Sequence, residues 1–195
     1  MASTVPETRA ALLAAAREEF TAHGIAGART DRIAERAGVN KERIYGHFGS
    51  KEKLFDAVIT EVLDECTAVL TLAPDDPAEY VGRTYDFHRE NPQLLRLMLW
   101  EALHYREEPL PGEEQRADRY ARKVTGLAEA LDTERNPEVA MTLLSLIGLA
   151  AWPHALPQLA RLIFQGAGDD TEITHQMVRD HIVAFTRRAL DSTTA

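Results

Sequence analysis

TDRIAERAGVNKERIYGHFGSK, residues 30–51, is the stretch of this 195-residue chain that decides its fold. It opens on a Thr-Asp pair, and such residues mark the start of a helix. Ile33, Ala34 and Ala37 then recur on one helical face. Gly38 follows and supplies the left-handed conformation at which helices end. The pattern predicts a short helix that stops at this glycine.

A second short helix is predicted directly after the turn, over residues 41–48, with Asn40 as its cap. Two helices that cross through a turn of three or four residues need a small residue at the crossing, a glycine in the turn and an aliphatic plug. Ala34, Gly38 and Ile44 stand at these three places. The spacing is therefore that of a helix-turn-helix.

The outward face of the second helix carries groups that suit DNA. Lys41 and Arg43 can donate to O6 and N7 of guanine, and Glu42 can accept from N4 of cytosine. Four further residues are better placed for phosphate oxygens: Thr30, Tyr45, His47 and Lys51. The alternative for this set is a solvated helix face, but its place between the glycine turn and the following Phe-Gly-Ser-Lys favours DNA.

The continuation YGHFGSK, residues 45–51, is more specific than the helix-turn-helix spacing. Together with Arg29-Thr30 before it and an amphipathic N-terminal helix, it closely resembles the TetR family of bacterial transcriptional regulators over residues 8–60; beyond them the likeness is architectural. The resemblance implies DNA contacts at Arg29, Thr30, Lys41, Arg43, Tyr45, His47 and Lys51. Asn40 is open between a structural cap and a backbone contact. Gly46 departs from the bulkier residue common there.

The charge is divided unevenly along the chain. The net charge is −9, yet residues 1–60 hold nine Lys/Arg and eight Asp/Glu and carry +1, which leaves −10 for residues 61–195. Phosphate binding depends on local cations. An acidic chain with a balanced N-terminal part is therefore compatible with DNA as a partner.

The remaining composition predicts a cytoplasmic protein that packs a core. Hydrophobic residues make up 45% of the chain, and the one cysteine, Cys66, excludes an internal disulfide and a cysteine-based zinc site. A buried small side chain is favoured for Cys66 over a redox sensor. No run of about 18 apolar residues and no signal-peptide pattern is found, so no membrane association is expected.

Helix signals are dense and strand signals nearly absent, so the fold class predicted is all-α. We expect a DNA-binding helix-turn-helix domain over residues 1–49, joined by a long helix (50–72, ending at Ala73-Pro74) to a regulatory domain over 50–195. The long helix should place Leu54, Val58, Val62 and Val69 inward. Further helices are expected near 77–90, 92–105, 113–131, 136–151, 154–165 and 171–190, with loops at 106–112 and 166–170. Caps before proline recur at Asp76, Asn91 and Asn136, and Ser50 caps the long helix. Thr4 opens the first helix, whose apolar stripe is Leu12, Ala16 and Phe20, and DSTTA forms a frayed tail.

A homodimer is expected, because one recognition helix covers too few base pairs for useful specificity. The TetR resemblance implies that the last two long helices form a four-helix bundle with their symmetry mates. The candidate interface residues are Leu143, Leu144, Ile147, Ile173, Met177, Ile182 and Phe185. The alternative is that these faces fill the core of one protomer.

A small-molecule effector is the third expected partner, after double-stranded DNA and a second copy of the chain. Large side chains with polar groups are the candidate pocket residues: Phe87, His88, Met98, Trp100, His104, Tyr105, Tyr120 and Trp152. Core packing is the alternative for each. Pro153 and Pro157 should interrupt the helix around His154 and give either a pocket mouth or a bend. An acid-poor aromatic pocket favours an uncharged or cationic ligand, unless Arg96 or Arg106 turns inward.

An enzyme is the alternative from another class. Glu101/His104 and Glu172/His175 are Glu-x-x-His pairs with the spacing of di-metal carboxylate sites, but such a site needs glutamates from two more helices, and Glu61, Glu65, Glu129 and Glu138 are poor candidates. No phosphate-binding glycine loop and no catalytic motif is present. We therefore predict no catalytic residues, no metal and no cofactor, and a regulator that is released from a pseudopalindromic operator by its effector, most simply a repressor. The alternative is an all-α ligand-binding protein or di-metal enzyme with a vestigial helix-turn-helix.

Overall fold

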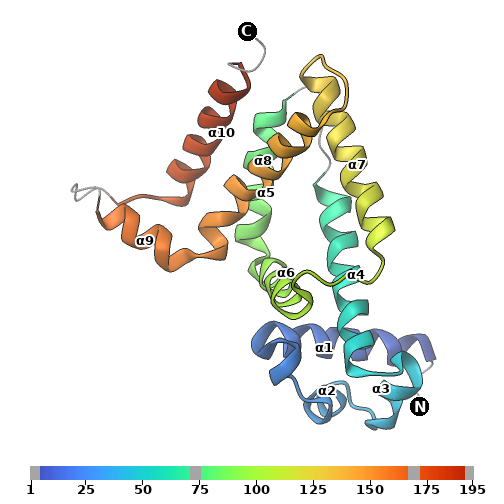
Figure 1. The fold of residues 1–195 in the computed structure, drawn as a ribbon. Helices are drawn as coiled ribbons and strands as arrows, with labels where there is room; N and C mark the ends of the chain where they lie inside the picture. Colours follow the sequence, from blue (N-terminus) through green and yellow to red (C-terminus); the bar gives the residue numbers. More distant parts are fainter. Residues whose placement is uncertain (1–4, 71–75, 167–171, 192–195) are drawn as a thin grey trace. The chain divides into compact units, whose positions relative to one another are not determined.

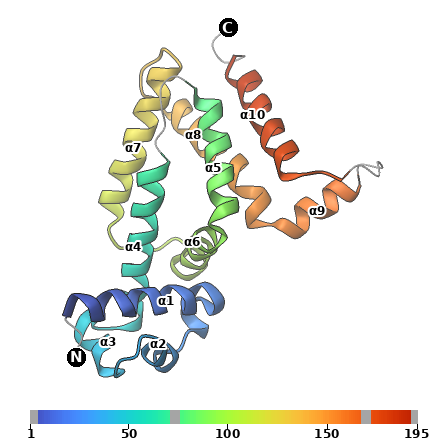
Figure 2. The ribbon, with the colours of Figure 1, turned by 180° about the vertical axis from the view of Figure 1, so that it is seen from behind.

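The computed structural model describes residues 5–70, 76–166 and 172–191, and in these ranges the regular structure is entirely α-helical (Figures 1 and 2). The helices are α1 (Val5–Gly27), α2 (Thr30–Arg36), α3 (Glu42–Phe48), α4 (Lys51–Val69), α5 (Pro77–Glu90), α6 (Pro92–Tyr105), α7 (Glu113–Ala130), α8 (Pro137–Ala155), α9 (Pro157–Gln165) and α10 (His175–Asp191). The predicted all-α class is confirmed.

Packing divides the chain into two compact units. The first unit comprises residues 1–66 and 96–111, and the second comprises residues 67–95 and 112–195. Helices α4 and α6 therefore each contribute residues to both units. The functional boundary between residues 49 and 50 stays a prediction, because packing alone does not say which residues bind DNA.

The core of the first unit is built on the predicted apolar stripe of α1. Leu12, Ala16 and Phe20 are fully buried. The ring of Phe20 meets Phe55 of α4 edge-on, with ring centroids 5.1 Å apart. Helices α1 and α4 share this core, and α2 and α3 connect them.

Helix α1 is kinked near its end, at Gly24. This residue has φ 63° and ψ 179°, a combination that is essentially confined to glycine. A Cβ built at Gly24 would lie 2.8 Å from the ring of Trp100 on α6, and the Trp100 indole N–H donates to the carbonyl of Thr21 at 3.4 Å. The Trp100 indole therefore occupies the space that a side chain at position 24 would need.

Replacing Gly24 with alanine should destabilise the first unit by more than the about 1–3 kcal/mol of a strained backbone, because the new methyl group also meets the Trp100 ring. Gly46→Ala is the control. Gly46 is helical with no atom within 4 Å of a built Cβ, so alanine should stabilise by up to about 1 kcal/mol. Urea unfolding followed by Trp100 fluorescence in a Trp152→Phe background measures both. Equal stabilities of the two variants would contradict the packing described.

The second unit is organised by α5, which lies against both α8 and α10. Arg179 of α10 connects α10 to α5: its Nε donates to Asp86 at 2.6 Å, and its guanidinium pairs with Glu79. Arg187 reaches Asp76 at 2.9 Å. These ion pairs hold α10 along one side of α5.

The predicted helix starts are largely confirmed. Asp76 accepts from the amide of Glu79, and Asn136 from the amide of Val139, each at 3.0 Å. Ser50 caps α4 through Lys53 N–H at 3.2 Å. Asn91 is different, because its side chain donates to the carbonyl of Phe87 and so closes α5 instead of capping α6.

The predicted interruption around Pro153 and Pro157 is present, but it falls at Leu156 and not directly after Trp152. Proline lies within the last turn of α8, which continues to Ala155. The helix ends at Leu156 (φ −126°, ψ 64°), because the residue before a proline, here Pro157, is driven out of the α conformation.

Three smaller expectations also change. Val69 is 60% exposed, although Leu54, Val58 and Val62 are buried as predicted, because Val69 is the last residue of α4 and lies beyond residue 66, where this part of the first unit ends. Helix α10 begins at His175, later than expected. Helix α4 ends at Val69, earlier than the predicted end near residue 72. The predictions for Thr4, for the stop at Ala73-Pro74, for the loop at 167–170 and for the tail at 192–195 lie outside the described residues.

Candidate nucleic-acid interface

The turn between α2 and α3 has the geometry that its sequence predicts. Gly38 adopts φ +66°, and the amide of Val39 donates to the carbonyl of Ala34 at 3.0 Å. Ile44 is fully buried beneath the crossing. Helix α3 begins one residue later than predicted, at Glu42, whose amide donates to the Asn40 side chain at 3.3 Å.

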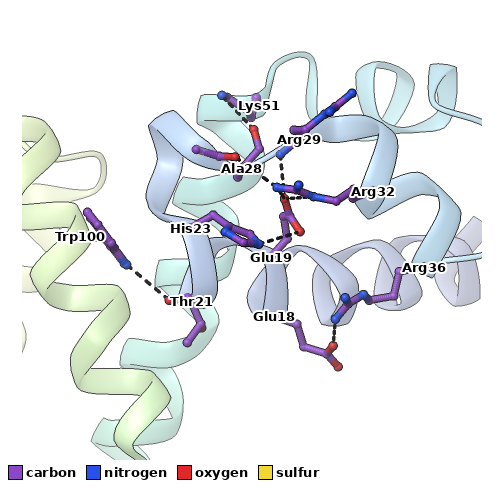
Figure 3. A network of polar contacts seen from close by, with 11 residues as sticks. Glu18, Glu19, Thr21, His23, Ala28, Arg29, Arg32, Arg36, Lys51 and Trp100 are labelled. Carbon is purple, nitrogen blue, oxygen red and sulfur yellow. Dashed lines mark hydrogen bonds and ion pairs between the residues drawn. The ribbon is translucent and has the colours of Figure 1, made fainter.

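A buried carboxylate fixes the start of α2 (Figure 3). The side chain of Glu19 is 3% exposed and accepts from the Arg29 amide at 2.9 Å and from Arg32 Nε at 2.8 Å. Burial raises the pKa of Glu19, but the hydrogen bonds from Arg32 and Arg29 outweigh it and hold the pKa below its ordinary value. Glu19 therefore stays ionised and anchors the residues predicted to meet phosphate.

Sequence reasoning missed Glu19, although a signal was present. Glu19 lies seven residues after Leu12 and three after Ala16, so it falls on the buried face of α1. An acid in that position requires a buried cationic or amide partner, and Arg32 and Arg29 are that partner.

The outward residues of α3 are available to a ligand. Arg43 and Gly46 are exposed, Tyr45 is 47% exposed, and His47 is half-buried. The ring of Phe48 at the end of the helix lies under the Arg9 guanidinium, 5.4 Å away. The exposed face is therefore polar and partly cationic, while Ile44 occupies the opposite face.

The exposed Asp31 forms ion pairs with two of the residues predicted to contact DNA. Asp31 pairs with Lys41 at 2.6 Å and with Arg29 at 3.7 Å. The hydrogen bond between them lowers the pKa of Asp31 and raises the pKa of Lys41. Lys51 lies at the start of α4, where its Nζ donates to the carbonyl of Ala28 at 3.4 Å. These pairs are exposed or weak, so acceptor groups of DNA can replace them.

The structure divides the eight candidate pocket residues between the two units. Met98, Trp100, His104 and Tyr105 belong to the first unit, and Phe87, His88, Tyr120 and Trp152 belong to the second. Trp100 packs on α1, and the Tyr105 hydroxyl donates to Asp56 at 2.7 Å. Of the others, Phe87 and His88 are buried, His104, Tyr120 and Trp152 are exposed, and Met98 is half-buried. Arg96 and Arg106 are exposed.

The candidate interface residues fall into two groups. Leu144, Met177 and Phe185 are 72%, 46% and 49% exposed, while Leu143 and Ile182 are buried in the protomer and Ile147 and Ile173 are half-buried. Helix α8 is long and apolar enough to cross a membrane by length and composition. A single such helix is weak evidence, because packed helices of soluble proteins pass the same test.

The described residues contain no group of three or more His, Cys, Asp or Glu side chains that could hold a metal ion. Glu101 and His104 lie in the first unit, and Glu172 and His175 lie in the second. The two Glu-x-x-His pairs therefore belong to different compact units.

A glycine turn, a buried crossing of two short helices and a cationic exposed face on the second helix define a helix-turn-helix DNA-binding protein. The chain belongs to the TetR family. The family described as bacterial regulatory proteins, tetR family, matches residues 12–58, and the tetracyclin repressor-like C-terminal domain matches residues 76–188. The protein is a DNA-binding transcriptional regulator.

Two similar proteins match almost the whole chain, and a third matches about half of it. The chain is similar to the HTH-type transcriptional repressor SCO4008 of Streptomyces coelicolor, with 36% identity over 98% of this chain and all of that protein. It is 36% identical to the HTH-type transcriptional regulator RutR of Escherichia coli over 51% of this chain and 50% of RutR. The crystal structure of SCO4942 from Streptomyces coelicolor aligns with a TM-score of 0.77 and 29% identity over 93% of this chain and 97% of that one. These relatives do not favour the alternative of a ligand-binding protein or enzyme with a vestigial helix-turn-helix.

Proposed function

We propose that this regulator is a cytoplasmic homodimeric repressor that binds a pseudopalindromic operator and leaves it when a small molecule binds. The observation that supports the proposal best is the exposed face of α3, which presents Lys41, Arg43 and Tyr45 above a fully buried Ile44. The repressor role follows the name of the relative SCO4008. The proposal includes no catalytic step and no cofactor.

Base reading is assigned to the start of α3. Lys41 and Arg43 donate to guanine edges, and Glu42 accepts from cytosine, because these donor and acceptor patterns identify base pairs in the major groove. Arg29, Thr30, Tyr45, His47 and Lys51 are assigned to the phosphate backbone, which positions the helix without reading sequence. Asn40 keeps a capping role through Glu42.

Replacing Lys51 with alanine should weaken binding to all duplexes by a similar factor. Each lost phosphate contact lowers the slope of log K against log salt by about one unit per protomer. Titrations between low and moderate salt, on operator and on unrelated DNA, measure this slope. Arg135→Ala, in the segment before α8, removes the same charge from the other compact unit and should leave the slope unchanged. If both variants behave alike, Lys51 does not contact phosphate.

Dimerisation is assigned to the exposed apolar face of α8 and α10. Leu144, Met177 and Phe185 lie there with large exposed fractions, and burial of such area provides about 25 cal/mol per Å². A two-fold dimer gives the operator its pseudopalindromic form, because each protomer inserts one α3.

The Leu144→Glu variant tests the dimer. A carboxylate in an apolar interface is strongly unfavourable, so sedimentation should find a dimer for the wild type and a monomer for this variant at micromolar concentration. Leu103→Glu is the matched control, since Leu103 is 66% exposed on α6 and outside the proposed interface. A monomeric wild type would contradict the proposal, as would an unaffected Leu144→Glu dimer.

The effector is proposed to act through a coupling free energy between its site and the DNA-binding helices. A coupling of about 1–3 kcal/mol changes DNA affinity about 5- to 150-fold. Helices α4 and α6 contribute residues to both compact units. A change within the second unit can therefore reach the first along continuous helix.

A further inference from the structure

A cavity of about 420 Å³ lies within the second unit, where α5, α8, α9 and α10 meet. Figures 1 and 2 both show α9 between the end of α8 and the start of α10. Pro153 and Pro157 line the cavity on either side of the α8–α9 break. Its volume falls within the range of about 300–1,000 Å³ that small-molecule sites occupy.

One corner of the cavity is polar and is formed by residues distant in sequence. The hydroxyl of Tyr85, a residue 1% exposed, lies 2.9 Å from Nδ1 of His175. His154 packs against Tyr85 with ring centroids 4.4 Å apart, and lies nearly parallel to His175 at 6.1 Å. All three residues line the cavity.

His154 leaves a hydrogen-bonding group unused. Its Nε2 is buried and has no hydrogen-bond partner among the described residues. Leaving such a group unpaired is unfavourable. A small turn of the His154 ring toward the cavity would bring Nε2 to a ligand hydroxyl, which can donate or accept and so fits either tautomer of the imidazole.

The cavity contains no concentration of charge. Burial, followed by the neighbouring His175, lowers the pKa of His154, and burial raises the pKa of Tyr85, so both are neutral near pH 7. The two charged lining residues, Arg161 and Glu172, have opposite signs and are exposed. Apolar side chains, including Ala160 and Phe164, supply much of the remaining wall.

We infer that this cavity is the effector site, and that it takes an uncharged ring compound carrying a hydroxyl group, with the hydroxyl at His154 and the ring along Phe164. That the ligand acts as an effector rests on the proposed function. The binding site itself is supported by the cavity and by the Tyr85–His154–His175 cluster. It lies apart from the pocket expected from the sequence, since none of those eight residues lines it.

The site is tested on the full chain with matched bicyclic probes. 2-Naphthol should bind, with its fluorescence as the signal, and the anion 2-naphthoate should bind at least about tenfold more weakly, because the cavity offers no net positive charge to a desolvated carboxylate. Ala160→Trp should abolish binding by filling the cavity. Ala117→Trp, at an exposed position of α7, should bind as the wild type does.

His154→Phe separates the hydrogen bond from the shape of the cavity. It keeps a ring against Tyr85, so naphthalene affinity should be unchanged, while the preference for 2-naphthol over naphthalene should fall about 2- to 10-fold. Absence of probe binding up to the solubility limit, stronger binding of 2-naphthoate, or unaltered binding to Ala160→Trp would each overturn the inference.

DNA binding by the same preparations keeps the two proposals distinct. Operator binding without probe binding would contradict the site and leave the regulator intact. Probe binding without any DNA binding would contradict the proposed function and leave the site intact. Probe binding that leaves operator affinity unchanged would show a ligand site that is not the effector site.

Discussion

The Lys41→Ala/Arg43→Ala double variant is expected to lose at least about 1,000-fold in affinity for the operator while binding unrelated DNA almost as the wild type does. Each guanine contact of this kind discriminates by about 1–3 kcal/mol, and a dimer loses four of them. The variant should therefore approach the non-specific limit, which lies about 10³- to 10⁷-fold below specific affinity. Fluorescence anisotropy on operator and scrambled duplexes measures both affinities.

The variant is expected to remain folded. Lys41 and Asp31 are 42% and 58% exposed, and exposed ion pairs contribute about 0–1 kcal/mol. Arg122→Ala/Arg135→Ala is the control, because it removes two exposed cations, one from α7 and one from the segment before α8. If this control loses as much specific affinity as the double variant, the effect belongs to overall charge, and the assignment of Lys41 and Arg43 to base reading is wrong.

Replacing His88 with leucine is expected to remove much of the acid sensitivity of the second unit. His88 is 5% exposed, and burial, together with His154 and Lys123, lowers its pKa to about 4 from 6.5. Below pH 6.5 the imidazole of His88 binds a proton in the unfolded chain but not in the folded chain, so the stability of the folded state falls progressively until about pH 4. The pKa shift corresponds to a loss of about 3 kcal/mol in the free energy of unfolding.

Urea unfolding between pH 7 and pH 4, followed by Trp152 fluorescence in a Trp100→Phe background, measures this loss. His88→Leu should be as stable as the parent or more stable at pH 7, because Nδ1 of His88 has no hydrogen-bond partner among the described residues and leucine removes that group. His104→Leu, at an exposed position of α6, should keep the acid sensitivity of the parent. Identical pH profiles for all three proteins would contradict the role given to His88.

Features set by neighbours along the chain could be predicted from the sequence. The stripe of Leu12, Ala16 and Phe20 follows the period of the helix, and Asp76 and Asn136 cap through amides three residues away. The helix-turn-helix could also be predicted, because the crossing of its two helices depends on spacings of a few residues. Local hydrogen bonds and helical periodicity carry that information without knowledge of the tertiary fold.

Features set by residues distant in sequence could not be predicted in the same way. Trp100 was expected in a pocket, yet it packs against the kink of α1, a contact that joins positions 79 residues apart. Tyr85 and His175 are 90 residues apart, and no periodicity relates them. The prolines around His154 did indicate an interruption, but only the packing of α5 and α10 against it encloses a cavity.

The central claim is that α3 reads DNA from a two-fold dimer. Selection of duplexes from a random pool by the purified protein, with a parallel selection by Lys41→Ala/Arg43→Ala, tests it most directly. The wild type is expected to enrich a site whose half-sites are related by two-fold symmetry, and the variant is expected to enrich none. Failure of a folded dimer to enrich any sequence at low salt would contradict the account, and so would enrichment of the same site by both proteins.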